Sequence, residues 1–466
     1  MEFHPEYYLV IAMFASFIAL IFTGFPVAWV LAGVGVGFTG IAWWSDNIMG
    51  WTFTGLDYNT LGLLTGRVFN IMDNWVLVAL PMFIFMGLML DKSGVAEQMM
   101  KSMQRLFGNV RGGLAITVTL IGIILAASTG IIGASVVLLG LMSLPVMLKQ
   151  NYDKPLALGT IAASGTLGIL IPPSIMLVIM GDQLGVSVGD LFMGAVIPGM
   201  ILGVLYITYI LLYGKLNPEK APLAADHTEI RLQDVLRVMM DIIPPALLIL
   251  AVLGSIFMGI ATVTEASGIG ALGATLLSLA YKRLDFGVVK DVVINTMNTS
   301  AYIFAIFIGA TIFALVLREC GGDELIETAL NSMGLGPYAL IGFVLLLIFA
   351  LGFFLDWIEI SLIILPLLGP VIGGLDLAVD GYGVVDNPNL VWFALLVAVT
   401  LQTSFLTPPV GFAIFYLKGV CPPGVKLTHI YKGVVPFIVL QLIGLGLVFY
   451  FPALVTWLPS VAYATN

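Results

Sequence analysis

The chain is poor in the residues that most enzymes use for their chemistry. Its 466 residues include only two cysteines and three histidines. The histidines, His4, His227 and His429, lie far apart in predicted loops, so the sequence offers no ligand cluster for zinc, haem or an iron–sulfur centre. The nucleotide-binding patterns GxxxxGKS and GxxxxGKT are also missing, which argues against ATP hydrolysis by this chain but not against a separate ATPase subunit. We therefore expect a protein that is not an enzyme.

Charge is equally scarce, because charged residues make up 10% of the chain and hydrophobic residues 60%. Charge-poor apolar runs of about 20 residues, long enough to cross a bilayer, recur from end to end. This pattern excludes a soluble core and predicts an all-α polytopic membrane protein, surrounded by the lipid bilayer and without a nucleic-acid partner. The N-terminus carries acids where a signal peptide needs basic residues, so we expect the first apolar run to stay as a helix.

Two of the apolar runs contain a double proline where a membrane helix should be continuous. These segments read Gly168-Ile-Leu-Ile-Pro-Pro-Ser174 and Ser404-Phe-Leu-Thr-Pro-Pro-Val-Gly411. Proline removes a backbone donor and clashes with the preceding turn, and hydrocarbon cannot satisfy the freed backbone groups. Irregular backbone at that depth indicates a cavity or a bound ion. Its occurrence once in each half is typical of secondary transporters built from two repeats.

The order of the apolar runs divides the chain into two similar halves. We expect spans over 7–22, 25–44 and 69–90, a polar amphipathic arm over 91–112, a re-entrant hairpin over 113–148, a broken helix over 155–182 and a span over 190–213. A polar linker over 214–241 follows. The second half repeats the order, with spans over 242–258, 262–281 and 291–317, an arm over 318–336, a hairpin over 337–373, a broken helix over 390–420 and a span over 432–458. Five crossings plus one hairpin in each half predict two inverted repeats.

The distribution of lysine and arginine supports this topology, because these residues collect on the cytoplasmic side of membranes. With both termini on the periplasmic side, Arg67 and Arg318 are the only two of the 18 lysines and arginines that fall outside. The same topology places Cys320 outside and Cys421 inside, so we expect no disulfide between them. The protein is predicted to lie in a bacterial or archaeal cytoplasmic (inner) membrane.

Several motifs resemble the large membrane subunit of tripartite ATP-independent periplasmic (TRAP) transporters, and the resemblance covers nearly the whole chain. These motifs are Leu80-Pro-Met-Phe-Ile-Phe-Met-Gly87, Gly168-Ile-Leu-Ile-Pro-Pro-Ser174, Ile197-Pro-Gly199, Gly259-Ile-Ala-Thr-Val-Thr-Glu-Ala266, Gly352-Phe-Phe-Leu-Asp356 and Leu406-Thr-Pro-Pro-Val-Gly411. The family often has Ser-Gly-Ser at the first hairpin tip, whereas this chain has Thr129-Gly130-Ile131. A serine hydroxyl ligand at the last of these positions is therefore ruled out.

The resemblance implies sodium-driven import of a small organic anion, such as a carboxylate, a sugar acid or a sulfonate. It implies two partners: a periplasmic substrate-binding protein that delivers the anion and a small four-helix membrane subunit. Sodium would be the coupling ion, with no organic cofactor. In the elevator mechanism of such proteins, residues 1–90 and 242–317 would form the fixed scaffold, the arms 91–112 and 318–336 would link it to the transport domain, and residues 113–213 and 337–466 would form that moving domain.

Unpaired carbonyls at hairpin tips and proline breaks suit sodium, and helix N-termini favour an anionic group. We predict one sodium site from Ser128, Thr129, Gly130, Ser135, Gly165 and Thr166, and a second from Asp356, Thr403, Ser404 and Thr407. The substrate would lie between them, near Pro172, Pro173, Ser174, Pro408, Pro409 and Val410. Each break is expected to face the hairpin tip of its own half.

Each of these residues also has an alternative interpretation, in which it serves helix packing or capping and binds no ligand. Small and hydroxylated residues are common wherever membrane helices pack, so the hypothesis depends on the cluster and not on its single members. Asp356 is a stronger candidate, because an acid within the membrane is costly and usually functional, and Glu359 one turn away could share its role. For Glu265 the pattern Thr262-x-x-Glu265 favours a capping box.

Two other kinds of transport protein are compatible with parts of the pattern. A stand-alone sodium/anion symporter of the same inverted-repeat architecture is the main alternative, since broken helices do not require a periplasmic partner. A channel fits less well, because hairpins that open from opposite faces suit alternating access better than a continuous pore.

Overall fold

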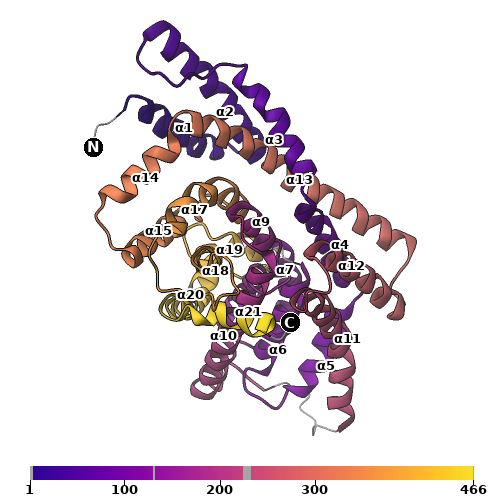
Figure 1. Cartoon of the computed structure of the whole chain (residues 1–466). Helices are drawn as coiled ribbons and strands as arrows, with labels where there is room; N and C mark the ends of the chain where they lie inside the picture. The colour runs from indigo at the N-terminus through magenta and orange to yellow at the C-terminus, as the bar shows by residue number, and fades with distance from the viewer. Residues whose placement is uncertain (1–3, 130–131, 224–231, 465–466) are drawn as a thin grey trace.

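The computed structural model describes residues 4–129, 132–223 and 232–464, and within these ranges the regular structure is entirely helical (Figure 1). Nine helices in the described ranges are long and apolar enough to cross a membrane. The predicted all-α polytopic membrane fold is confirmed. The number of crossings and the inversion of the second half stay predictions.

The helices of the first half follow the predicted order. They are α1 (Glu6–Ile21), α2 (Val27–Trp44), α3 (Leu63–Met72), α4 (Ala79–Lys92), α5 (Val95–Leu106), α6 (Gly113–Thr129), α7 (Ile132–Lys149), α8 (Lys154–Thr166), α9 (Ile175–Leu184) and α10 (Val188–Leu216). Short turns, η1 (Ser45–Met49), η2 (Thr60–Gly62), η3 (Trp75–Val78) and η4 (Leu167–Ile169), adjoin some of them.

The second half contains α11 (Leu232–Phe257), α12 (Val263–Ala280), α13 (Phe286–Glu319), α14 (Gly322–Ser332), α15 (Pro337–Leu351), α16 (Trp357–Glu359), α17 (Leu365–Gly373), α18 (Pro388–Leu406), α19 (Phe412–Gly419), α20 (Leu427–Tyr450) and α21 (Ala453–Ala464). The π-helical turn η5 (Ile360–Ile364) joins α16 to α17. The capping box predicted at the start of α12 is confirmed, since Thr262 and Glu265 bond each other's backbone N–H groups.

Two predicted spans are wrong as continuous helices. The span over 69–90 is divided, because Asn74 takes an extended conformation and its side chain accepts the Val76 N–H, which ends α3 and starts η3 and α4. The span over 432–458 is also divided. Here α20 ends at Tyr450, and α21 begins at Ala453 directly after Pro452, whose ring cannot continue a helix.

The outer helices pack in pairs, and each pair joins one helix of the first half to one helix of the second half. Helix α2 packs along α13, and α12 packs along α4. Figure 1 shows α13 crossing the molecule beside α1, α2 and α3, with α4, α11 and α12 following on one side. The amphipathic segment α5 packs against α11 and α6 and buries Val95, Met99 and Met103.

The hairpins and broken helices form a central bundle around α8 and α18. Every residue of α8 from Leu156 to Thr166 is buried, and so is every residue of α18 from Val391 to Leu406. Helices α8 and α20 cross where Gly159 meets Gly433, and a Cβ on Gly159 would collide with the Gly433 carbonyl. These two glycines therefore allow the backbones to touch, as small residues do in membrane helix packing.

Candidate ion and anion site at the helix breaks

The first break separates α8 from α9 at the predicted double proline. Helix α8 ends at Thr166, η4 follows, and α9 begins at Ile175 after the Pro172–Pro173 peptide, which is cis. The Ser174 hydroxyl closes the gap by donating to the Ile169 carbonyl at 2.6 Å. The first N–H groups of α9 have no helical acceptor, so this helix end presents donors and a positive dipole to the space beside the break.

The second break has the same design. Helix α18 ends at Leu406, α19 begins at Phe412, and the Pro408–Pro409 peptide is also cis. Because proline has no N–H, the carbonyls of Ser404 and Phe405 lose their helical partners. The Ser404 carbonyl accepts the Thr407 N–H at 3.0 Å instead. Hydroxyls line the end of α18, where Thr407 donates to the Thr403 carbonyl at 2.7 Å.

Each hairpin contacts both halves of the molecule. The expectation that each break faces the hairpin tip of its own half stays a prediction, because the first tip lies outside the described residues. The second arm of hairpin one, α7, packs on α8 of its own half and on α19 of the other half. The corresponding arm of hairpin two, α17, packs on α18 and on α9. Helices α9 and α19, which follow the two breaks, therefore each lie against the hairpin of the other half, and both breaks border one central region.

The first predicted sodium site is brought together only in part within the described residues. Gly130 lies outside these residues. Ser128 and Thr129 end α6, but their side chains also lie outside them. Ser135 is buried on α7, and its neighbour Val136 packs so closely on Gly165 of α8 that a Cβ there would overlap it.

Thr166, the remaining member of that predicted site, is buried at the end of α8. Its hydroxyl donates to the Ala163 carbonyl at 2.9 Å. A hydroxyl oxygen that donates to a carbonyl keeps its lone pairs, so Thr166 can still face a cation. The described part of this site therefore consists of backbone and hydroxyl oxygens where α7 meets the end of α8.

At the second predicted site, Ser404 joins the broken helix to its hairpin. Its hydroxyl donates to the Phe349 carbonyl on α15 at 2.9 Å, and Gly352 packs against the same side chain. Asp356 lies four residues after Gly352, and its carboxylate accepts the Trp357 N–H at 2.8 Å and caps α16. These contacts thus join Ser404 to the segment that leads to Asp356. Hydroxyl, carbonyl and carboxylate oxygens are the donors that hard cations prefer.

Glu359 is the most unusual polar residue of the region. Its side chain is 2% exposed, and one carboxylate oxygen has no hydrogen-bond partner. A buried polar atom without a partner costs about 1–3 kcal/mol. The described residues contain no group of three or more histidine, cysteine or acidic side chains that could hold a metal. A cation here would therefore be held mainly by backbone and hydroxyl oxygens, with Asp356 and Glu359 as the charged neighbours.

Sequence reasoning missed two tyrosines beside these carboxylates. Tyr302 on α13 and Tyr416 on α19 both lie within electrostatic range of Asp356 and Glu359. The Tyr416 ring also packs on Gly133 at the start of α7, so this side chain contacts the first hairpin. No sequence signal identifies Tyr416, because its role depends on contacts between distant segments.

The six predicted substrate residues lie in different surroundings. Pro172, Pro173 and Ser174 are buried, and Pro172 lines an apolar cavity of about 500 Å³ between α6, α10 and α11. In contrast Pro408 and Val410 are half-buried and Pro409 is exposed. The second break is therefore the more accessible of the two.

The family model described as "Tripartite ATP-independent periplasmic transporter, DctM component" matches residues 14–454. The chain belongs to this family. The chain is therefore a multi-pass permease component of a membrane transporter, and the resemblance stated from the motifs is confirmed.

Named relatives match over most of this permease. The C4-dicarboxylate TRAP transporter large permease protein DctM of Rhodobacter capsulatus is 30% identical over 468 residues, which cover 96% of this chain and 98% of the relative. The isethionate TRAP transporter permease protein DctMQ of Oleidesulfovibrio alaskensis is 27% identical over 443 residues, which cover 95% of this chain and 65% of that relative. The chain thus spans about two thirds of the isethionate permease.

One solved structure shares the fold. The crystal structure of the Alcanivorax borkumensis YdaH transporter superposes with a TM-score of 0.58, at 12% sequence identity, over 96% of this permease and 98% of that chain. At this identity the likeness establishes the fold alone.

Proposed function

We propose that this DctM-family permease imports a small organic anion together with sodium, and that a periplasmic substrate-binding protein delivers the anion. The observation that carries the proposal is the pair of proline breaks, each bordered by hairpins from both halves. A secondary transporter needs a cation site and an anion site that rearrange together, and breaks of this kind supply both within one region.

Sodium is proposed to bind on the two flanks of this region. On one flank, the donors would come from the first hairpin tip with Ser135, Gly165 and Thr166. On the other flank, they would come from Asp356, Thr403, Ser404 and Thr407. The buried carboxylate of Glu359, one oxygen of which lacks a partner, supports a cation near the second flank, because a cation would offset the cost of that burial.

The anion is proposed to lie between the flanks, against the start of α9 and α19. The relatives are named for C4-dicarboxylates and isethionate, which carry a carboxylate and a sulfonate respectively. Both groups are anions with several oxygen acceptors, which suits the unpaired N–H groups of helix N-termini. Tyr416 would add a phenolic hydroxyl from α19.

The elevator movement is part of the same proposal. Helices α2, α4, α12 and α13 would stay fixed, while the central bundle around α8 and α18 moves past them. The small membrane subunit would enlarge the fixed part. Paired contacts α2–α13 and α4–α12 support one continuous outer unit, because each pair joins the two halves outside the central bundle.

Reconstitution tests this proposal. Proteoliposomes would contain the permease with its small subunit, and uptake of radiolabelled succinate or isethionate would be measured with and without sodium and the cognate binding protein. We expect uptake only when all components and an inward sodium gradient are present. Uptake by this chain alone would instead support a stand-alone symporter, and uptake without sodium would remove the coupling ion from the proposal.

A further inference from the structure

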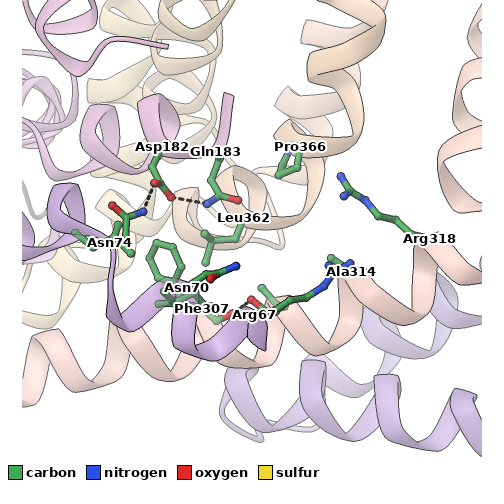
Figure 2. Close-up of a pocket in the computed structure, with 14 residues that line it drawn as sticks. Arg67, Asn70, Asn74, Asp182, Gln183, Phe307, Ala314, Arg318, Leu362 and Pro366 are labelled. Carbon is green, nitrogen blue, oxygen red and sulfur yellow. Dashed lines mark hydrogen bonds between the residues drawn. The ribbon is translucent and has the colours of Figure 1, made fainter. Parts of the chain in front are cut away.

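A cavity of about 230 Å³ with both polar and apolar lining residues lies away from the helix breaks, between the outer helices α3 and α13 and the central elements α9, η5 and α17 (Figure 2). One face of α3 lines it through Arg67, Asn70 and Ile71, which are spaced by three and four positions, and Asn74 lines it just after this helix. A water molecule occupies about 30 Å³ in the liquid, so this cavity has room for a small organic molecule.

Two arginines line the cavity, and they are the two that break the charge pattern of the sequence. Arg67 comes from α3 and Arg318 from the end of α13, and Figure 2 shows Arg318 extending towards Pro366 across the cavity. All other lysines and arginines fall on the predicted cytoplasmic side. The charge pattern that places the other basic residues in the cytoplasm therefore does not explain Arg67 and Arg318. Both of these side chains line the same cavity.

Two acidic residues lie near the arginines: Asp182 in the described lining, and Asp323, which pairs with Arg318 at the exposed rim. Both Asp182 oxygens are occupied by amide N–H groups, from Asn74 at 2.5 Å and from Gln183 at 2.8 Å. None of the ion pairs among the described residues involves Arg67.

Arg318 has one partner at the rim. Its Nε lies 3.2 Å from an Asp323 oxygen, in a pair whose side chains are 40% and 53% exposed. Exposed pairs of this kind contribute little, about 0–1 kcal/mol. No ion pair among the described residues involves the two terminal nitrogens of this guanidinium, and their planar spacing matches the oxygens of a carboxylate or sulfonate.

Helix α13 lines a long edge of the cavity. Phe307, Ala314 and Arg318 all face it from α13, over a length of about 16 Å at 1.5 Å per residue.

We propose that Arg67 and Arg318 form an outer anion-capture site, which binds the carboxylate or sulfonate of an incoming substrate before it reaches the helix breaks. The site lies between elements proposed to be fixed and elements proposed to move, so movement of the central bundle would separate its lining and release the anion. The role in import rests on the proposed function, whereas anion attraction by the cavity does not.

Charge-selective labelling tests the site without a transport assay. The substitution Asn70→Cys places a thiol in the cavity, and the unsubstituted chain, whose Cys320 is buried, gives the background. Membranes with the permease and its small subunit are treated with the anionic 2-sulfonatoethyl methanethiosulfonate or its trimethylammonium counterpart. We expect the ratio of anionic to cationic labelling rates to fall at least about tenfold when Arg67→Gln and Arg318→Gln are added, because each lost charge slows one reagent and speeds the other.

Matched variants make the outcome decisive. Arg67→Lys with Arg318→Lys keeps both charges and should keep most of the ratio. Ser332→Cys, exposed at the far end of α14, should show no dependence on the arginines. An unchanged ratio in the double glutamine variant would overturn the site. A preference that appears only after the binding protein is added would also overturn it, since the arginines would then serve docking of that protein. An importer without sodium coupling could still pass this test, so failure here is distinct from failure of the proposed function.

Discussion

The substitution Asp356→Asn separates the charge of this residue from its structural role. Asp356 caps α16 by accepting the Trp357 N–H at 2.8 Å. Asparagine is as good an N-cap as aspartate, so the amide oxygen keeps this bond while the negative charge is lost. The substitution Asp356→Ala removes both the charge and the cap, and it serves as the matched comparison.

The expected magnitudes differ for the two roles. Loss of the cap in Asp356→Ala should lower the free energy of unfolding by about 0.5–2 kcal/mol without sodium, whereas Asp356→Asn should change it by only about a few tenths. Sodium at 20 times its Kd stabilises the wild type by about 1.8 kcal/mol. If loss of the carboxylate weakens sodium binding tenfold, the same concentration stabilises the variant by only about 0.6 kcal/mol.

Both the stability without sodium and the stabilisation by sodium can be measured by unfolding the purified permease complex in detergent. Sodium chloride and choline chloride are compared at equal ionic strength. The expected result is a nearly normal stability in choline for Asp356→Asn, together with a reduced gain from sodium. In transport, the sodium concentration for half-maximal uptake should rise correspondingly. An undiminished gain from sodium in Asp356→Asn would refute the assignment of this carboxylate to the cation site.

Three further predictions test the packing and the missed residues. Gly159→Ala should destabilise the protein by about 1–3 kcal/mol in thermal or denaturant unfolding, because its methyl group collides with the Gly433 carbonyl, whereas Gly446→Ala on α20, with open space around it, should not. Tyr416→Phe should reduce uptake by about 2–10-fold at low substrate with little change in stability, as expected for one lost hydrogen bond, and an unchanged uptake would remove its hydroxyl from the site. Glu359→Met should leave stability without sodium equal or higher, since it removes a buried oxygen without a partner, while sodium-driven uptake is lost; normal uptake would contradict a role for this carboxylate.

The sequence was sufficient to predict the local elements of this fold. Double prolines set the ends of α8 and α18, because proline cannot continue a helix, and the structure ends these helices at Thr166 and Leu406. Hydrophobic spacing likewise predicted the amphipathic helix α5. The break at Asn74 was missed, because hydropathy averages over a whole run and does not register a single residue whose side chain caps the next turn.

Contacts between the halves could not be predicted in the same way. Tyr416 follows the second break in the sequence but packs on Gly133 of the first hairpin, and Arg67 shares a cavity with Arg318 at the end of a different helix. Hydropathy and motif spacing describe neighbours along the chain, whereas these pairs depend on how the two halves interlock. The charge pattern did mark both arginines as exceptions, but it held no information about their proximity.

The interlocked hairpins suggest why a cation and an anion would move together. Helix α7 packs on both α8 and α19, and α17 packs on both α18 and α9. A cation that orders one hairpin tip therefore also fixes the post-break helix of the opposite half, whose N-terminus is proposed to hold the anion. Each ligand would then lower the ordering cost of the other, which is a coupling free energy between two sites and must be reciprocal. Sodium affinity should accordingly rise by the same factor when substrate is present as substrate affinity rises with sodium.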